Sequence, residues 1–142
     1  MARENLNGVH DLSQLSPEEI NSISEHYGHL LAEVQKVKTN QVRNIFSTVM
    51  VLRTKLQTLR KNEKGNEDNK EQWFDEFRND LILIKPKLAY ASGRQRNVRP
   101  LYELLSKGVD ATVNANDKEK ALKNFIQLVE SIVAYHKFYG GN

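Results

Sequence analysis

The sequence predicts an all-α fold, a compact bundle of about five antiparallel amphipathic helices. Apolar residues recur at alternating spacings of three and four, several of these runs follow helix-capping signals, and no stretch alternates apolar and polar residues with period two over more than four residues. The chain has 142 residues, 39% of them hydrophobic, which suits one core and a single helical domain over residues 1–142. A coiled coil would share the spacing, but each run is under three heptads, which favours globular packing.

The first predicted helix covers residues 16–38. Ser16 and Glu19 can form a capping box, and Pro17 suits the first helical position. The apolar residues that follow line one face: Ile20, Ile23, Tyr27, Leu30, Val34 and Val37. Residues 1–15, ahead of this start signal, are expected to be loosely ordered.

The second and third predicted helices flank a polar stretch at residues 62–69, which predicts a loop. Thr39 is the expected N-cap of the second helix. We expect the third helix to end before Pro86, because the residue before a proline disfavours helical geometry. The apolar faces comprise Val42, Ile45, Val49, Leu52, Leu56 and Leu59 in the second helix, and Trp73, Phe74, Phe77, Leu81 and Ile84 in the third.

Two further helices complete the predicted bundle. The fourth begins around residues 98–100, after a short segment at residues 87–94, and the fifth follows a capping box from Asn116 to Glu119. Gly140 and Gly141 close the fifth helix. Their apolar residues are Leu101, Leu104, Leu105 and Val109, then Leu122, Phe125, Ile126, Val129, Ile132 and Val133. Because the connections are mostly short, neighbouring helices are expected to run antiparallel.

The net charge of +3 conceals a strong segregation of charge along the chain. The segments 1–38, 39–66, 67–84, 85–113 and 114–142 carry −3, +5, −4, +4 and +1. No Asp or Glu occurs from Thr39 through Asn62, and the side opposite the apolar face carries Arg43, Ser47, Thr54, Gln57 and Lys61. Cations and neutral hydrogen-bonding groups without acids suit contact with phosphate oxygens. The alternative is a basic helix balanced by the acidic third helix beside it.

A second basic stretch, residues 85–99, is interleaved with Tyr90 and Gly93. Arginine forks match phosphate, and a tyrosine ring offers a base a stacking surface. Two acid-poor basic stretches therefore indicate a nucleic-acid partner, single-stranded or RNA. The predicted RNA-contacting residues are Arg43, Arg53, Arg60, Lys61, Lys85, Lys87, Tyr90, Arg94, Arg96, Arg99 and Lys137. Arg53 and Arg60 border the apolar face, so either can instead pack with its stem buried.

No motif for catalysis, metal binding or a cofactor is present. The absence of cysteine excludes disulfides, zinc ribbons and thiol nucleophiles, and no P-loop or nucleophile elbow occurs. His26 and His29 lack the spacing of a helical zinc site and are expected at the surface, whereas His136 is expected in the core with a hydrogen-bond partner. We expect a non-enzymatic, soluble, cytoplasmic protein without a membrane partner, because no secretory or membrane-spanning segment is apparent.

Three stretches together resemble a known family. They are Thr39-Asn40-Gln41-Val42-Arg43-Asn44-Ile45, Lys87-Leu88-Ala89-Tyr90-Ala91-Ser92-Gly93-Arg94, and residues 130–139, Glu-Ser-Ile-Val-Ala-Tyr-His-Lys-Phe-Tyr. In this order and spacing they resemble the small subunit of the type III-A CRISPR effector, the Csm complex, over roughly residues 38–139. Ser92 stands where the family usually has alanine. The N-terminal 38 residues match poorly, so the acidic first helix is expected to serve packing or subunit contacts.

The resemblance implies a non-catalytic, all-α, RNA-binding subunit of an antiviral defence complex. Several copies would stack along the guide RNA and target RNA, beside the repeated backbone subunit and in contact with the large signalling subunit. By motif position it implies that Arg43 and Arg94 face RNA and that Tyr90 and Gly93 shape the same region; Tyr135 and Lys137 carry over less directly. The alternative from the residues alone is a helical protein–protein adaptor without nucleic-acid contact.

Overall fold

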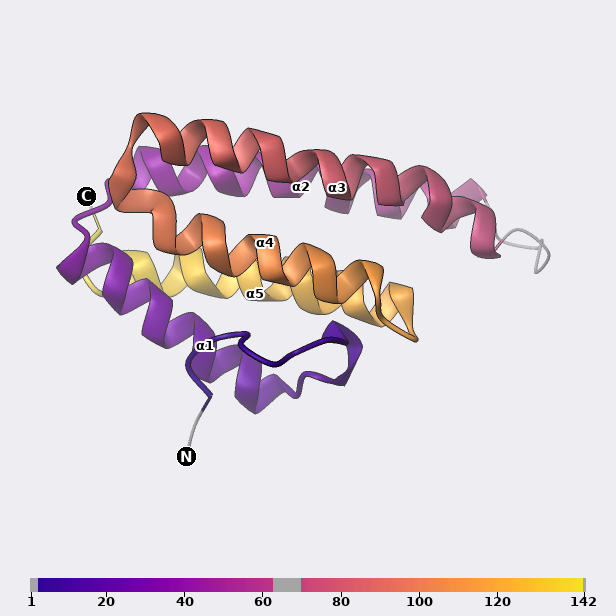
Figure 1. The fold of residues 1–142 in the computed structure, drawn as a ribbon, viewed down its shortest axis with the longest axis horizontal. Helices are drawn as coiled ribbons and strands as arrows, with labels where there is room; N and C mark the ends of the chain where they lie inside the picture. Colours follow the sequence, from indigo (N-terminus) through magenta and orange to yellow (C-terminus); the bar gives the residue numbers. More distant parts are fainter. Residues whose placement is uncertain (1–2, 63–69, 142) are drawn as a thin grey trace.

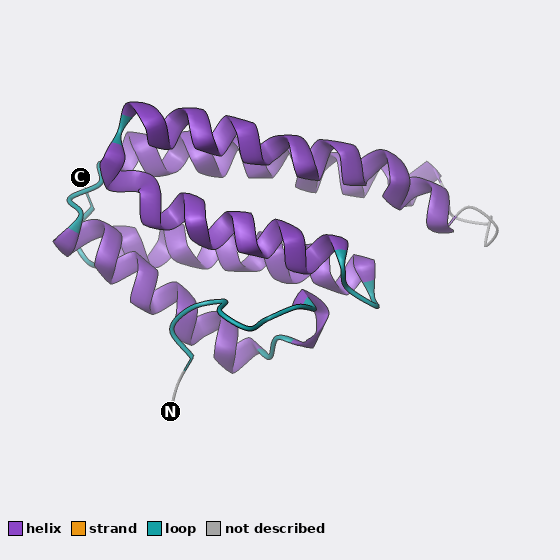
Figure 2. Cartoon of the chain, in the orientation of Figure 1, coloured by secondary structure: helices purple, strands orange, loops and turns teal. Residues whose placement is uncertain are grey.

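The structure is a computed structural model that describes residues 3–62 and 70–141. The side chains of residues 59–62, 70–73 and 76 are not described. The described residues form helices and connecting segments and contain no strand, which confirms the predicted all-α class (Figure 2). None of the helices in this part of the chain is long and apolar enough to cross a membrane. The elements are η1 (Leu12–Gln14), α1 (Pro17–His29), η2 (Leu30–Val34), α2 (Thr39–Asn62), α3 (Lys70–Arg94), η4 (Arg96–Val98), α4 (Arg99–Val113) and α5 (Lys118–Phe138).

Helix α5 is the centre of the bundle. It contacts α1, α2 and α4 as well as η1 and η2, so it buries residues on more than one side: Ala121, Leu122, Phe125, Ile126, Leu128, Val129 and Ile132. Helices α2 and α3 form a long antiparallel hairpin across α4 and α5, while α1 lies on the other side of the bundle (Figure 1). A single cluster of buried apolar side chains joins all five α-helices.

The first predicted helix changes its register near its end. Leu30–Val34 form a π-helical turn, η2, in which the Gln35 amide donates to the Leu30 carbonyl at 2.9 Å. A π turn inserts an extra residue and rotates the side chains that follow. As a result Leu31 is fully buried, whereas Val34, predicted on the apolar face, is 60% exposed.

Helix α3 continues through Pro86 to Arg94, so the predicted end before the proline is wrong. A proline inside a helix removes one backbone hydrogen bond and costs about 3 kcal/mol. Pro86 lies on the exposed side of α3, while Leu88 and Ser92 beyond it are buried. Burial of this last part of α3 offsets the cost, and the basic stretch around Gly93 is therefore helical rather than a loop.

Helix caps agree with the sequence at α1 but not at α2 and α5. The Ser16–Glu19 capping box is present, with both hydrogen bonds at 3.1 Å. At α5 the N-cap is Asp117, whose side chain accepts from the Lys120 amide at 3.0 Å, so the predicted Asn116 box is wrong. Thr39 is the first residue of α2, and the cap position falls one residue earlier: the Lys38 carbonyl accepts from the Val42 amide at 3.2 Å, and the Lys38 amide donates to the Gln41 side chain at 2.8 Å.

The N-terminal segment packs against the bundle, contrary to the expectation that residues 1–15 are loosely ordered. Within its described part, Leu6 and Leu12 are almost completely buried. The Asn124 side-chain amide donates to the Leu12 carbonyl at 2.9 Å. The Asp11 carboxylate accepts from the Asn116 amide at 3.2 Å and so joins the segment to the connection between α4 and α5.

Gly28 is required for the close packing of α1 on α5. A Cβ atom there would lie 2.4 Å from the Tyr135 Cβ and 2.8 Å from the His136 backbone nitrogen, whereas a Cβ at Gly93 would meet nothing within 4 Å.

We predict that Gly28→Ala destabilises the fold by about 1–3 kcal/mol, the usual range for overpacking. Gly93→Ala is the matched control and should be neutral or stabilising by up to about 1 kcal/mol from helix propensity. Urea unfolding that gives Gly28→Ala at least wild-type stability would contradict this packing.

The hydrogen bonds that the Asp11 carboxylate accepts predict a dependence of stability on pH. Hydrogen bonds from the Ser13 hydroxyl, and then from the Asn116 and Ser13 amides, hold the pKa of the Asp11 carboxyl below its usual 3.8 despite an opposing desolvation effect. A carboxyl with a lowered folded-state pKa stabilises the fold above its unfolded pKa, and this contribution is lost as the pH falls through the folded pKa. Asp11→Asn should therefore cost about 0.5–1 kcal/mol at pH 7. In thermal melts at decreasing pH, the stability difference between Asp11→Asn and wild type should shrink below the usual carboxyl pKa. A stability difference that stays constant with pH would contradict the role of these hydrogen bonds.

Candidate nucleic-acid interface

The two basic stretches of the sequence meet at one end of the bundle, where α2 begins and α3 ends (Figure 1). Gln41 joins them. Its side-chain amide donates to the Gln95 side-chain oxygen, and its own oxygen accepts from the Asn97 side chain at 3.4 Å. The start of α2 is thereby fixed against the junction between α3 and α4.

We call this surface the basic end and define it by six predicted residues: Arg43, Lys87, Tyr90, Arg94, Arg96 and Arg99. All six are exposed. Lys87, Tyr90 and Arg94 are spaced by three and four residues, so they share one face of α3. The sequence has no Asp or Glu in residues 34–62 or 81–102, so the segments that form this surface bring almost no negative charge to it.

The cations of the basic end are largely free of internal ion pairs. Within the part of the chain that the structure describes, Arg43, Lys87, Arg94 and Arg96 have no carboxylate within 4.0 Å. Arg99 lies 3.4 Å from Glu103, but both side chains are mostly exposed, so this pair is weak. A phosphate can therefore bind here without displacing a strong internal partner.

Tyr90 and Arg94 form a mixed aromatic and cationic site on α3. The Tyr90 ring is 69% exposed, and the Arg94 guanidinium lies 5.9 Å from its centroid. A cation–π contact of this kind favours an extended arginine next to the ring. The pair therefore offers a phosphate-binding fork beside a surface on which a base can stack.

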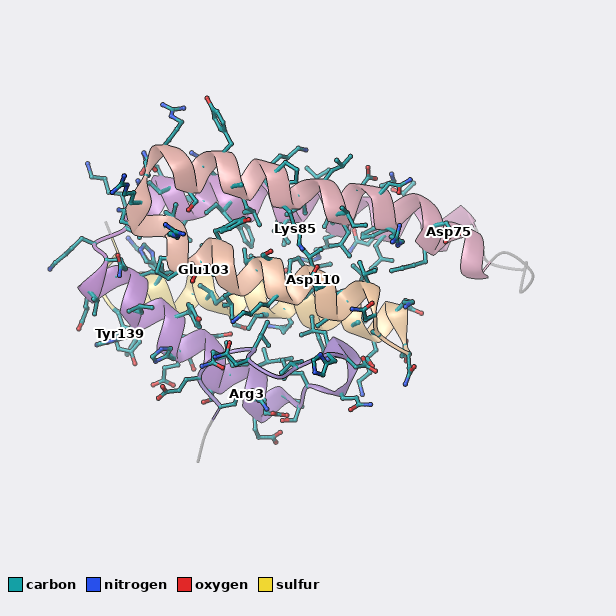
Figure 3. The ribbon with its side chains drawn as sticks, viewed as in Figure 1. Arg3, Asp75, Lys85, Glu103, Asp110 and Tyr139 are labelled. Atoms are coloured by element: carbon teal, nitrogen blue, oxygen red, sulfur yellow. The ribbon has the colours of Figure 1, made fainter. Side chains whose placement is uncertain are left out.

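Two predicted RNA-contacting residues are instead held in ion pairs between helices. The Arg53 guanidinium of α2 lies 2.7 Å from the Glu130 carboxylate of α5. The Lys85 ammonium of α3 lies 2.5 Å from the Asp110 carboxylate of α4, and Figure 3 shows these two residues where the helices face each other. Arg53 lies farther along α2 than the basic end, and Lys85, two residues before Lys87, pairs with α4 instead of facing solvent. Both cations join neighbouring helices of the bundle.

Three predicted RNA-contacting residues remain, Arg60, Lys61 and Lys137, and none has a described contact with the residues of the basic end. Arg60 and Lys61 lie outside the residues whose side chains the structure describes. Lys137 is exposed on the last turn of α5, and the neighbouring Tyr135 hydroxyl donates to the Asn21 side chain of α1 at 2.5 Å.

His26, His29 and His136 occupy the positions that the sequence predicts. His26 and His29 are exposed on α1, and His29 lies 2.8 Å from the Glu33 carboxylate. His136 is buried, and its Nε2 lies 2.7 Å from the Val37 carbonyl oxygen. Over residues 3–62 and 70–141, no group of three or more His, Cys, Asp or Glu side chains is arranged to hold a metal ion.

Lys36 and Lys38 belong to the same end of the bundle but are missing from the predicted residues. Both are exposed in the linker between η2 and α2, and Lys38 is joined through Gln41 to the α3–α4 junction. The net charge of −3 over residues 1–38 hides these two cations. The acid-free run, which already begins at residue 34, is the signal that could have found them.

The fold and this surface define a small all-α protein with an arginine-rich end that carries almost no acids. Residues 14–142 match the protein family described as Csm2 Type III-A, and the chain belongs to this family, which confirms the resemblance seen in its sequence.

The chain is also similar to two curated relatives, each named "CRISPR system Cms protein Csm2". It is 37% identical to the protein of Streptococcus thermophilus over 73 residues, which are 51% of this chain and 59% of that protein. It is 37% identical to the protein of Enterococcus italicus over 67 residues, which are 46% and 47% of the two chains. The chain thus spans about half the length of the curated relatives it matches. No solved structure matches it.

The hydrogen bonds of Gln41 predict a local effect of its removal. Gln41→Ala should free the α3–α4 junction from α2, because the Lys38, Gln95 and Asn97 contacts are lost together. We expect faster amide hydrogen exchange in residues 38–42 and 95–98 and a global loss of about 1 kcal/mol or less. Gln57→Ala, an exposed position on the same helix, is the control and should leave exchange unchanged. Equal exchange in both variants would contradict the bridging role.

Proposed function

We propose that the protein is a non-catalytic RNA-binding subunit of a type III-A CRISPR effector complex, and that the basic end is its RNA surface. The observation that carries the proposal is the grouping of exposed cations on segments without acids, where only Arg99 has a carboxylate within 4.0 Å in the described part of the chain. Membership of the Csm2 Type III-A family supports the setting in an RNA-guided complex.

The chemistry of the basic end fits the backbone of a single RNA strand. Arg43, Arg94 and Arg96 present planar forks that can each hold two oxygens of a phosphate. Tyr90 adds a ring on which an unpaired base can stack. A regular duplex has no unpaired base to place there. No base-specific hydrogen-bonding pocket is needed, so the contact would be independent of sequence.

We further propose that the subunit acts as a scaffold along the guide RNA and the target RNA. Several copies would line the RNA beside the repeated backbone subunit, with the large signalling subunit at one end, in the cytoplasm. A surface with few phosphate contacts binds weakly alone, but neighbours in a filament raise its effective concentration. The acidic α1, on the other side of the bundle from α3, remains free for contacts with protein subunits (Figure 1).

The phosphate contacts predict a defined change in salt dependence. Each cation that neutralises a phosphate contributes about 0.7 to the slope of log affinity against log salt concentration on a single strand. The double variant Arg43→Gln/Arg94→Gln should weaken binding to labelled single-stranded RNA and reduce this slope by about 1.4. The matched control is Lys120→Gln/Lys123→Gln, two exposed lysines at the start of α5, and it should bind like wild type.

The same titration separates the proposal from the protein–protein adaptor. Charge reversal at Arg43 and Arg94 should abolish RNA binding, whereas an adaptor would keep its partners and lose nothing in RNA affinity. Absence of RNA binding by the wild-type protein at low salt, both alone and within the assembled complex, would refute the RNA role.

A further inference from the structure

Lys36 has a backbone conformation that lysine rarely adopts. Its φ is +55°, and it is the only non-glycine residue with a positive φ among those that the structure describes. It follows the π turn at a helix end, where the Val37 amide donates back to the Leu31 carbonyl at 2.8 Å. Glycine is the usual residue at such a position, because it has no Cβ to clash in the left-handed region. A lysine here lowers stability relative to glycine, and strained backbone of this kind is most often found at functional sites.

A buried histidine, His136, holds the linker at residues 35–38, which contains Lys36. His136 is 1% exposed, and its Nε2 donates to the Val37 carbonyl at 2.7 Å. The C-terminal segment closes over the ring: a Cβ at Gly141 would lie within 2.1–2.7 Å of three ring atoms, and the Gly141 amide donates to the His136 carbonyl at 2.9 Å. The ring therefore has little freedom to move, and the Val37 carbonyl is fixed with it.

On the other side of Val37, the linker is fixed to the basic end. The Lys38 amide donates to the Gln41 side chain, which in turn contacts Gln95 and Asn97. Lys36 and Lys38 thus flank a clamped carbonyl, with both side chains exposed. Neither has a carboxylate partner within 4.0 Å over the described ranges of the chain.

We propose that Lys36 and Lys38 form a further phosphate-binding element of the RNA surface, and that His136 is a positioning residue that acts on them through Val37. The inference rests on the proposed RNA-binding function. Lys36 supplies a cation from a left-handed backbone position, in spite of the effect of that conformation on stability. The ligand is the phosphodiester backbone of a single RNA strand, and the element extends the basic end across the start of α2.

Lys36→Gly tests this proposal, because it changes stability and binding in opposite directions. The variant should raise the Tm, since glycine relieves the strain, and at the same time reduce the salt slope for labelled single-stranded RNA by about 0.7. Lys36→Arg is the matched control and should keep the slope without raising the Tm. An unchanged slope in Lys36→Gly, with wild type binding RNA, would overturn the proposal and leave Lys36 as a helix-ending residue only. No RNA binding by wild type would instead refute the proposed function itself.

The positioning role of His136 is tested by a double-mutant cycle. His136→Leu removes the hydrogen bond to Val37, and binding is measured well below the Tm of each variant. If His136 acts through the linker, this change weakens RNA binding in the wild-type background but has no further effect in Lys36→Gln/Lys38→Gln. His136→Gln, which keeps a side-chain donor, should restore part of the affinity. Equal losses in both backgrounds would overturn the positioning role.

Discussion

The burial of α5 among its neighbours is the constraint on which the rest of the structure depends. Because α5 contacts α1, α2 and α4, its apolar residues extend around more than one side of the helix. This places the last turn of α5, with His136, beneath the linker that leads into α2. That contact holds the linker from which α2, the helix that carries Arg43, begins. Close packing of α1 at Gly28 brings that helix against the same turn, at Tyr135 and His136.

The distribution of charge follows the architecture. Ion pairs between helices, such as Arg53 with Glu130 and Lys85 with Asp110, lie along the length of the bundle, where both signs are present. At the basic end the sequence supplies almost no acids, so Arg43, Arg94 and Arg96 keep their charge available to solvent and to ligands. A cation without a local partner contributes little to stability and stays available to a ligand of opposite charge.

The sequence predicts the helices well, because their apolar periodicity is local and long. It fails where tertiary packing overrides a local rule: α3 passes through Pro86 since the residues beyond it are buried, and the π turn at Leu30–Val34 moves Val34 to the surface. It also cannot separate free from paired cations, because the partner of Arg53 lies 77 residues away along the chain. The sequence assigns Arg43 and Arg94 to RNA contact only through acid-free composition and family resemblance, and this assignment stays a prediction. The role proposed for Lys36 could not be inferred from the sequence, because its backbone conformation leaves no signal in composition.

Chemical footprinting of arginines is the most direct test of the central claim that the basic end is the RNA surface. The wild-type protein would be modified with an arginine-specific dicarbonyl reagent, with and without saturating single-stranded RNA at low salt, and the modified positions read by mass spectrometry. The account predicts that RNA protects Arg43, Arg94 and Arg96, while Arg78, exposed on the far part of α3, and Arg3, paired with Glu19, react as before. Equal protection at all five arginines, or protection confined to Arg3 and Arg78, would contradict it.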